Sequence, residues 1–249
     1  MMSGGGSRPD DLEPLIITID GPAGTGKSTA GRELANRLGL EFLDTGAMYR
    51  AATALVIDER IDPNDETAVA SAVEHAEIRF DWSTDPPTIL CHGRQLRDRL
   101  RESDIAELIS TLAAQAPLRE VLVRRQRAIG IAHPRLVTEG RDQGSVVFPN
   151  AQVKIYMHAS ARIRAERRAS QLAASGKHVN VDAIESELVR RDERDANRAV
   201  GPLVRPDGAV DVDTSSLSFD ESIDELESIV RTHAPEASLA CASSQRGHG

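Results

Sequence analysis

Several features that would place a chain in whole classes of protein are missing from this sequence. Aromatic residues make up 3% of its 249 residues and the formal net charge is -9, whereas a nucleic-acid surface needs basic patches and stacking rings. No run approaches the roughly 18 apolar residues of a membrane span. We therefore predict neither a nucleic-acid partner nor a membrane partner.

Cysteine and histidine are too sparse and too scattered for a disulfide framework or a metal cluster. The two cysteines, Cys91 and Cys241, show no paired spacing, and the seven histidines show no ligand spacing. The start of the chain is rich in Gly, Ser, Pro and Asp and lacks the apolar region of a secretory signal. These observations predict a cytoplasmic protein with disordered tails at 1–11 and 235–249. Nothing in the sequence suggests an obligate oligomer, so we expect a monomer.

The most informative feature that is present is a glycine-rich loop. Residues 21–28 read GPAGTGKS, which matches the pattern G-x-x-x-x-G-K-[ST] of a phosphate-binding loop. The loop follows a β-branched apolar run at 15–20 and precedes a helical segment at 29–38, which is the required order. Its glycines permit positive φ, so backbone N–H groups can surround phosphate oxygens. Lys27 would then act on the β- and γ-phosphates, and the Ser28 hydroxyl would ligate Mg²⁺.

The rest of the chain alternates strand and helix signals. An α/β fold follows, with three layers around a mainly parallel sheet of five strands. The segment at 62–97 departs from this pattern and reads as a small insert with a helix at 66–75 and an antiparallel hairpin. Further strands are predicted at 40–43, 136–138, 153–157 and 209–212, and helices after Asp44 or Thr45 and at 103–114, 118–131 (with Pro117 at its first position), 161–174, 181–198 and 219–231.

Two charged clusters lie downstream of the loop. The first, Gly140-Arg141-Asp142, follows the third strand, and the second carries charges at three- and four-residue spacing on one helical face at 191–198. A mixed-charge face is usually a solvated helix laced with ion pairs. Phosphoryl transfer instead needs positive charge around the transferred group, which arginine supplies with bidentate geometry. For the helical cluster alone, the residues leave both interpretations open.

Four segments taken together resemble the bacterial cytidylate kinase family. The resemblance runs in order from about residue 15 to residue 230, and three of its segments are specific, whereas the glycine loop is widely shared. It implies a P-loop kinase fold at 12–234, with a monophosphate-binding insert at about 62–97 and a helical lid at about 160–198. It also implies that ATP phosphorylates CMP and dCMP with the help of Mg²⁺. The segments are 19–29 (IDGPAGTGKST), 43–50 (LDTGAMYR), 139–149 (EGRDQGSVVFP) and 191–200 (RDERDANRAV).

The same resemblance implies roles for individual residues. Lys27, Arg141, Arg191 and Arg198 would act on the transferring phosphoryl group. Ser110, Arg119 and Asp195 would read the cytosine and the sugar. Glu139 is our candidate for a water-mediated Mg²⁺ contact beside Ser28. The ATP-binding set is Gly21, Pro22, Ala23, Gly24, Thr25, Gly26, Lys27, Ser28, Thr29, Arg164 and Arg168, and the monophosphate-binding set is Thr45, Arg50, Ser110, Arg119, Arg141, Asp142, Arg191, Asp195 and Arg198.

Two alternative functions remain open at this point. One is another P-loop kinase acting on a small molecule such as UMP, dTMP or shikimate. The other is a regulatory module that binds nucleotides without turnover. The intact Lys27, Ser28 and arginine set argue against the regulatory module, because a pure binding protein does not need charge directed at a transition state.

Overall fold

The fold is built on a five-stranded parallel sheet. The computed structural model describes residues 13–174, 176 and 180–239. The strand order is β2-β6-β1-β7-β8, and every neighbouring pair is parallel, which confirms the predicted sheet. Its strands are β1 (Leu15–Asp20), β2 (Glu41–Asp44), β6 (Arg135–Gly140), β7 (Val153–His158) and β8 (Val210–Asp213).

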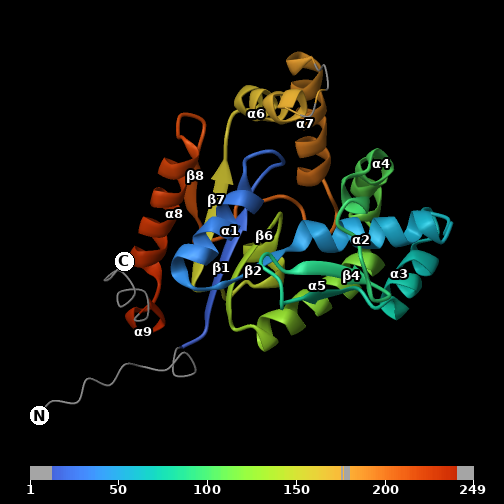
Figure 1. Cartoon of the computed structure of the whole chain (residues 1–249), viewed down its shortest axis with the longest axis horizontal. Helices are drawn as coiled ribbons and strands as arrows, with labels where there is room; N and C mark the ends of the chain where they lie inside the picture. Colours follow the sequence, from blue (N-terminus) through green and yellow to red (C-terminus); the bar gives the residue numbers. More distant parts are fainter. Residues whose placement is uncertain (1–12, 175, 177–179, 240–249) are drawn as a thin grey trace, which may run out of the picture.

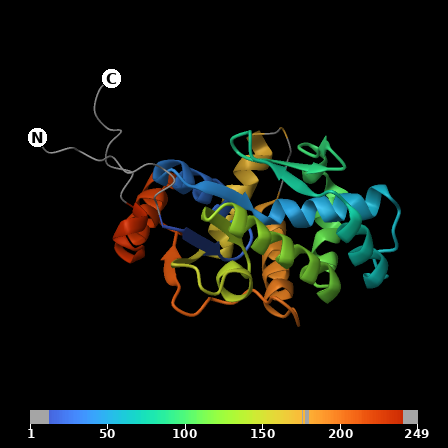
Figure 2. The same cartoon turned by 90° about the horizontal axis from the view of Figure 1, so that it is seen from below.

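Helices cover both faces of this sheet and complete the three predicted layers (Figures 1 and 2). On one face, Leu34 and Ile223 bring two helices into a single buried cluster with Ile17 of the central strand. On the other face, Met48 and Leu122 anchor a second buried cluster. A parallel sheet is apolar on both faces, so both must be covered. The helices of the first face are α1 (Lys27–Leu38) and α8 (Phe219–His233), and those of the second are α2 (Thr45–Asp58) and α5 (Ala116–Ala132).

A small antiparallel sheet lies in the insert, and it has one strand more than the predicted hairpin. Its order is β3-β4-β5. The last two strands are joined by His92 and Gly93, whose φ angles are 47° and 74°. Two successive residues with positive φ form the tight turn that a two-residue hairpin requires, and histidine is an unusual residue there. The elements of this region are α3 (Glu66–His75), β3 (Arg79–Asp81), β4 (Thr88–Cys91), β5 (Arg94–Gln95), η2 (Arg99–Arg101) and α4 (Ser103–Leu112).

Two helices, α6 (Ala161–Ala174) and α7 (Val181–Ala196), pack against each other beyond the tip of β7 (Figure 1). The side chain of Asn180 caps α7 by accepting from the backbone N–H of Asp182. Because α7 ends at Ala196, Arg198 lies just beyond the helix and not on its face as predicted. In open α/β sheets the ligands bind at the carboxyl ends of the strands, which is the end that this helix pair faces.

Several element bounds differ from the sequence prediction. The first helix begins at Lys27 and not at 29, and Pro117 is the second residue of α5 and not the first. The strand β6 continues to Gly140, and a π-helical turn η3 (Gln143–Val147) follows it. A short helix, α9 (Glu236–Leu239), occupies part of the predicted tail at 235–249. The predicted tail at 1–11 and Cys241 lie outside the described residues. Within the described ranges, no helix is both long enough and apolar enough to cross a bilayer.

Candidate active site

The phosphate-loop sequence adopts the backbone that its glycines permit. Gly21 has a φ of 147°, and a Cβ at this position would overlap the backbone carbonyl of Met157. Gly24 and Gly26 also have positive φ, at 79° and 92°. Gly26 is the N-cap of α1 and offers no capping side chain, so the first N–H groups of that helix remain available to an anion.

Lys27 is buried at the start of α1 without an acidic hydrogen-bond partner among the described residues. Its Nζ donates to the carbonyl of Pro22 at 2.6 Å and to the hydroxyl of Thr25 at 3.4 Å. Burial, and secondarily the neighbouring Arg141, lower the pKa of Lys27 to about 7. The ammonium is therefore held in a place where a negatively charged ligand would stabilise it.

Ser28 and Glu139 form an oxygen-rich pair beside this lysine. The Ser28 hydroxyl donates to Oε1 of Glu139 at 2.8 Å. Burial, and then the charge of Asp44, raise the pKa of Glu139 to about 7. The described residues contain no group of three or more His, Cys, Asp or Glu that could enclose a metal. A hydroxyl with one carboxylate still fits Mg²⁺, which is often bound by one or two carboxylates together with substrate phosphates.

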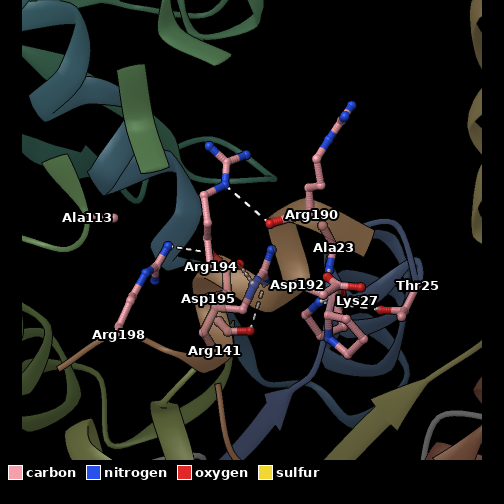
Figure 3. A network of polar contacts seen from close by, with 12 residues as sticks. Ala23, Thr25, Lys27, Ala113, Arg141, Arg190, Asp192, Arg194, Asp195 and Arg198 are labelled. Carbon is pink, nitrogen blue, oxygen red and sulfur yellow. Dashed lines mark hydrogen bonds and ion pairs between the residues drawn. The ribbon is translucent and has the colours of Figure 1, made fainter. Parts of the chain in front are cut away.

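A cluster of arginines surrounds the buried carboxylate of Asp195 (Figure 3). Asp195 accepts from Nε of Arg141 at 2.9 Å and also from Arg198. The Nε of Arg191 is buried and has no hydrogen-bond partner among the described residues. Burial lowers the pKa of both Arg191 and Arg198, and neighbouring arginines contribute to the shifts. Three cations around one carboxylate leave an excess of positive charge, which suits a phosphate group.

A second buried ion pair, between Arg119 and Asp142, lies next to Tyr49. Arg119 also donates to the carbonyl of Ala113 at 3.3 Å, and its guanidinium lies 5.7 Å from the centre of the Tyr49 ring. Within the described ranges, the buried Tyr49 hydroxyl has no hydrogen-bond partner, and burial raises the pKa of Tyr49 to about 12. The loop after α7 covers this pair so closely that a Cβ on Gly201 would overlap the Arg119 guanidinium.

The remaining predicted residues are placed as follows. Thr45 is buried and donates to the backbone carbonyl of Glu139 at 2.7 Å, while Arg50 pairs with Asp44 at 2.8 Å. Ser110 is half-buried on α4, and within the described residues it makes no hydrogen bond with the other predicted ligands. Thr29 and Arg168 are exposed. Arg164 is buried, and its guanidinium donates to the carbonyl of Ala23 inside the loop at 2.9 Å.

Sequence reasoning missed Asp20, the last residue of β1. Its two carboxylate oxygens accept from the backbone N–H groups of Gln143 at 2.8 Å and Gly144 at 2.7 Å. These bonds tie the glycine-loop strand to the turn that follows Arg141. Burial raises the pKa of Asp20 to about 6. A carboxylate at the end of an otherwise apolar strand was the available signal, because such a group is buried only when it has partners.

Three further arginines of α5 have architectural partners. Arg125 donates to the carbonyls of Val73, Glu74 and Ala76 at the end of α3. Arg127 donates to carbonyls of the turn η3, and Arg124 pairs with Glu74. In each case the partner of the arginine is a neighbouring helix or turn.

Comparison with known proteins gives consistent matches. The profile of the family described as cytidylate kinase matches residues 17–232. A cytidylate kinase of Corynebacterium glutamicum is 43% identical over 222 residues, covering 88% of this chain and 96% of that protein. One from Nocardia farcinica is 43% identical and covers 87% and 94%. Among solved structures, a shikimate kinase from Bacteroides thetaiotaomicron has a TM-score of 0.43 at 12% identity and covers 87% of this chain and 98% of its own.

Proposed function

Because the chain belongs to the cytidylate kinase family, we propose that it transfers the γ-phosphoryl group of ATP to CMP and dCMP, giving ADP and the corresponding diphosphates. The observation that carries the proposal is that Arg141 and Arg198 both pair with Asp195 at the sheet end that also holds the phosphate loop (Figure 3). Arg191 adds a third positive charge, because its buried guanidinium interacts electrostatically with Arg141, Asp195 and Arg198. Such a site supplies positive charge on both sides of a transferred phosphoryl group.

In the proposed reaction, an oxygen of the CMP phosphate attacks the γ-phosphorus, and the bond from that phosphorus to the β,γ-bridging oxygen breaks. The acceptor oxygen is already anionic, so the residues need not supply a general base. Lys27, with a pKa lowered to about 7 in the ligand-free site, regains its charge when the β- and γ-phosphates bind beside it. Ser28 and Glu139 would hold Mg²⁺, which would neutralise part of the negative charge of the phosphates.

Recognition of the base is assigned to Arg119 and Asp142, with Tyr49 beside them. Cytosine presents an exocyclic amino donor next to the N3 and O2 acceptors, so a carboxylate and an arginine side by side complement it. The sequence prediction gave the carboxylate role to Asp195. Its partners, Arg141 and Arg198, favour a different role for Asp195, that of positioning the arginines that bind phosphate.

An assay of ADP release across several acceptors tests this proposal. We expect turnover with CMP and dCMP and much slower turnover with UMP, dTMP and shikimate. Equal activity with UMP, or no activity with any acceptor, would overturn the proposed function. A cytoplasmic location and a monomeric state remain predictions, and sedimentation of the full chain with and without nucleotides tests the second.

A further inference from the structure

One residue of the phosphate loop, Ala23, is held by both α6 and α7. Figure 3 shows Ala23 beside Asp192 of α7. The backbone N–H of Ala23 donates to Oδ1 of Asp192 on α7 at 3.3 Å. The carbonyl of Ala23 accepts from the guanidinium of Arg164 on α6 at 2.9 Å. Arg164 and Asp192 in turn form an ion pair at 2.7 Å. Two side chains from different helices therefore fix both polar groups of one loop residue.

Burial makes this three-way contact more than a surface ion pair. The side chain of Arg164 is 6% exposed and that of Asp192 is 20% exposed, and Nε of Arg164 also donates to the carbonyl of Ala159 at 3.0 Å. The next loop residue, Gly24, lies against the same two helices, since a Cβ there would be 3.5 Å from Cβ of Arg164 and 3.8 Å from a methyl group of Leu188. Charged groups with this little exposure need partners, and those of Arg164 and Asp192 come from each other, from Ala23 of the loop and from the carbonyl of Ala159.

The loop itself cannot supply equivalent rigidity. Its three glycines have positive φ, and glycine has the largest conformational freedom to lose. The N–H groups that follow Ala23 must nevertheless point toward a common anion. Fixing the peptide groups on either side of Ala23 restricts the orientation of those that follow.

We propose that Asp192 is a positioning residue for the phosphoryl donor: together with Arg164 it clamps Ala23 and couples closure of the lid to the shape of the phosphate loop. The inference rests on the proposed function in that it takes the donor to be a nucleoside triphosphate. According to this proposal, different residues of α7 serve the two substrates. Asp195, one turn further on, orders the arginines of the acceptor side, whereas Asp192 orders the donor side.

The test compares Asp192→Ala with a variant that removes a different ion pair between α6 and α7. Asp182 pairs with Arg162, which also joins α7 to α6, and within the described residues neither side chain hydrogen-bonds to the phosphate loop. Asp182→Ala therefore removes one exposed ion pair between α6 and α7, while Arg162 keeps Glu185 as a partner and the contacts of Ala23 are unaltered. Glu193→Ala is a second control, because Glu193 is the exposed neighbour of Asp192. Affinities for CMP and for a non-hydrolysable ATP analogue are measured by calorimetry on the full chain, and amide exchange is followed at residues 23–26.

For Asp192→Ala we expect about tenfold weaker binding of the ATP analogue, a similar rise in the KM for ATP and faster exchange at 23–26. The affinity for CMP should stay within about twofold. Asp192→Asn keeps a carbonyl oxygen for the Ala23 N–H but loses the ion pair, so it should give an intermediate loss and guards against a folding failure of the alanine variant.

An Asp182→Ala variant that weakened the analogue as much as Asp192→Ala would overturn the clamp, as would an equal loss of CMP affinity. The clamp would also be overturned if both Asp192 variants bound the ATP analogue as tightly as the wild type does. The clamp and the proposed function can fail separately. If the Asp192 variants bound the analogue more weakly than the wild type, but the wild type did not phosphorylate CMP, the clamp would stand and CMP would be ruled out as the acceptor.

Discussion

Lys27 carries a charge that has no carboxylate as hydrogen-bond partner within the part of the chain that the structure describes. The pKa of Lys27 in the fold, about 7, lies below its ordinary value of 10.5, so the unfolded chain holds more protons than the folded chain between these values. Lys27 therefore reduces stability fully below about pH 7, and this cost fades as the pH rises toward 10.5. Residues that serve function often reduce the stability of the folded protein, and Lys27 is one of them.

We predict that Lys27→Met raises the free energy of unfolding of the ligand-free protein by roughly 1–3 kcal/mol at pH 7, and that this advantage shrinks by pH 10. The same variant should lose turnover by on the order of 10²-fold or more. Thermal melts at the two pH values and an ADP-release assay measure both effects. Lys154→Met, at a half-buried lysine outside the site, is the control. A less stable Lys27→Met protein with near-normal turnover would contradict the assignment of Lys27.

We propose that single side chains also decide the choice of base. Uracil presents an acceptor at O4 and a donor at N3. In the proposed site, the O4 acceptor would face the Asp142 carboxylate, which is also an acceptor, and the N3 donor would face the Arg119 guanidinium, which is also a donor. Each unpaired buried polar group costs roughly 1–3 kcal/mol, so we expect CMP to exceed UMP by on the order of 10²- to 10⁴-fold in kcat/KM. Asp142→Asn replaces the carboxylate by an amide that can donate to O4 of uracil. The ratio of kcat/KM for CMP to that for UMP should therefore fall by about tenfold or more.

Asp195→Ala is the matched comparison, because Asp195 is equally buried but pairs with Arg141 and Arg198. It should slow CMP and UMP alike and leave their ratio unchanged. A ratio that moved with Asp195 and not with Asp142 would restore the original sequence prediction. The sequence could place both carboxylates near the site, but it could not say which one lies beside Arg119, since that depends on how β6 and α7 approach each other.

At the scale of elements, the loop after α7 covers Arg119 and Asp142, the base-reading pair of the proposed site. It is tied down by the N–H of Leu203, which donates to the carbonyl of Asp195 at 2.8 Å. Gly201 has a φ of 61° and lies against both Arg119 and Asp142. No sequence motif distinguished this glycine from the others, because its requirement arises from a contact between distant segments.

We predict that Gly201→Ala lowers kcat/KM for CMP by at least about tenfold, since the added methyl group must displace the Arg119 guanidinium. Affinity for the ATP analogue should be retained. Gly208→Ala is a precise control for backbone strain, because Gly208 has a φ of 74° and an added Cβ there meets nothing within 4 Å. Equal losses in the two variants would mean that strain, and not contact with the base-reading pair, explains the effect.

Element prediction succeeded where local signals were strong and failed where they depended on long-range contacts. The order of strand, glycine loop and helix could be read from residue types. The third strand of the insert could not, because it depends on a histidine at positive φ. The π-helical turn after Arg141 was missed for a similar reason: its first N–H groups are held by Asp20, more than a hundred residues earlier in the chain.

At the scale of the whole molecule, the insert and the lid lie on different sides of one sheet end, and α8 lies at the far end from α3 (Figures 1 and 2). Two carboxylates hold cations of the site: Asp142 pairs with Arg119, and Asp195 pairs with Arg141. Nucleotides would replace some of these contacts and add new ones to both regions. We expect both regions to close then, because water must be excluded from the γ-phosphate.

We therefore predict slower amide exchange over about 62–97 and 160–198 when CMP and a non-hydrolysable ATP analogue bind together. The regions should respond separately to single ligands. CMP alone should protect the insert, because Arg119 and Tyr49 lie on the elements that flank it, while the analogue alone should protect the lid through the contacts of Arg164 and Asp192 with the loop. The helix α8 is the internal reference, because it packs on α1 and β8. Protection that appeared equally in α8 would indicate general stabilisation by ligand binding, and unchanged exchange in the insert and the lid would rule out closure.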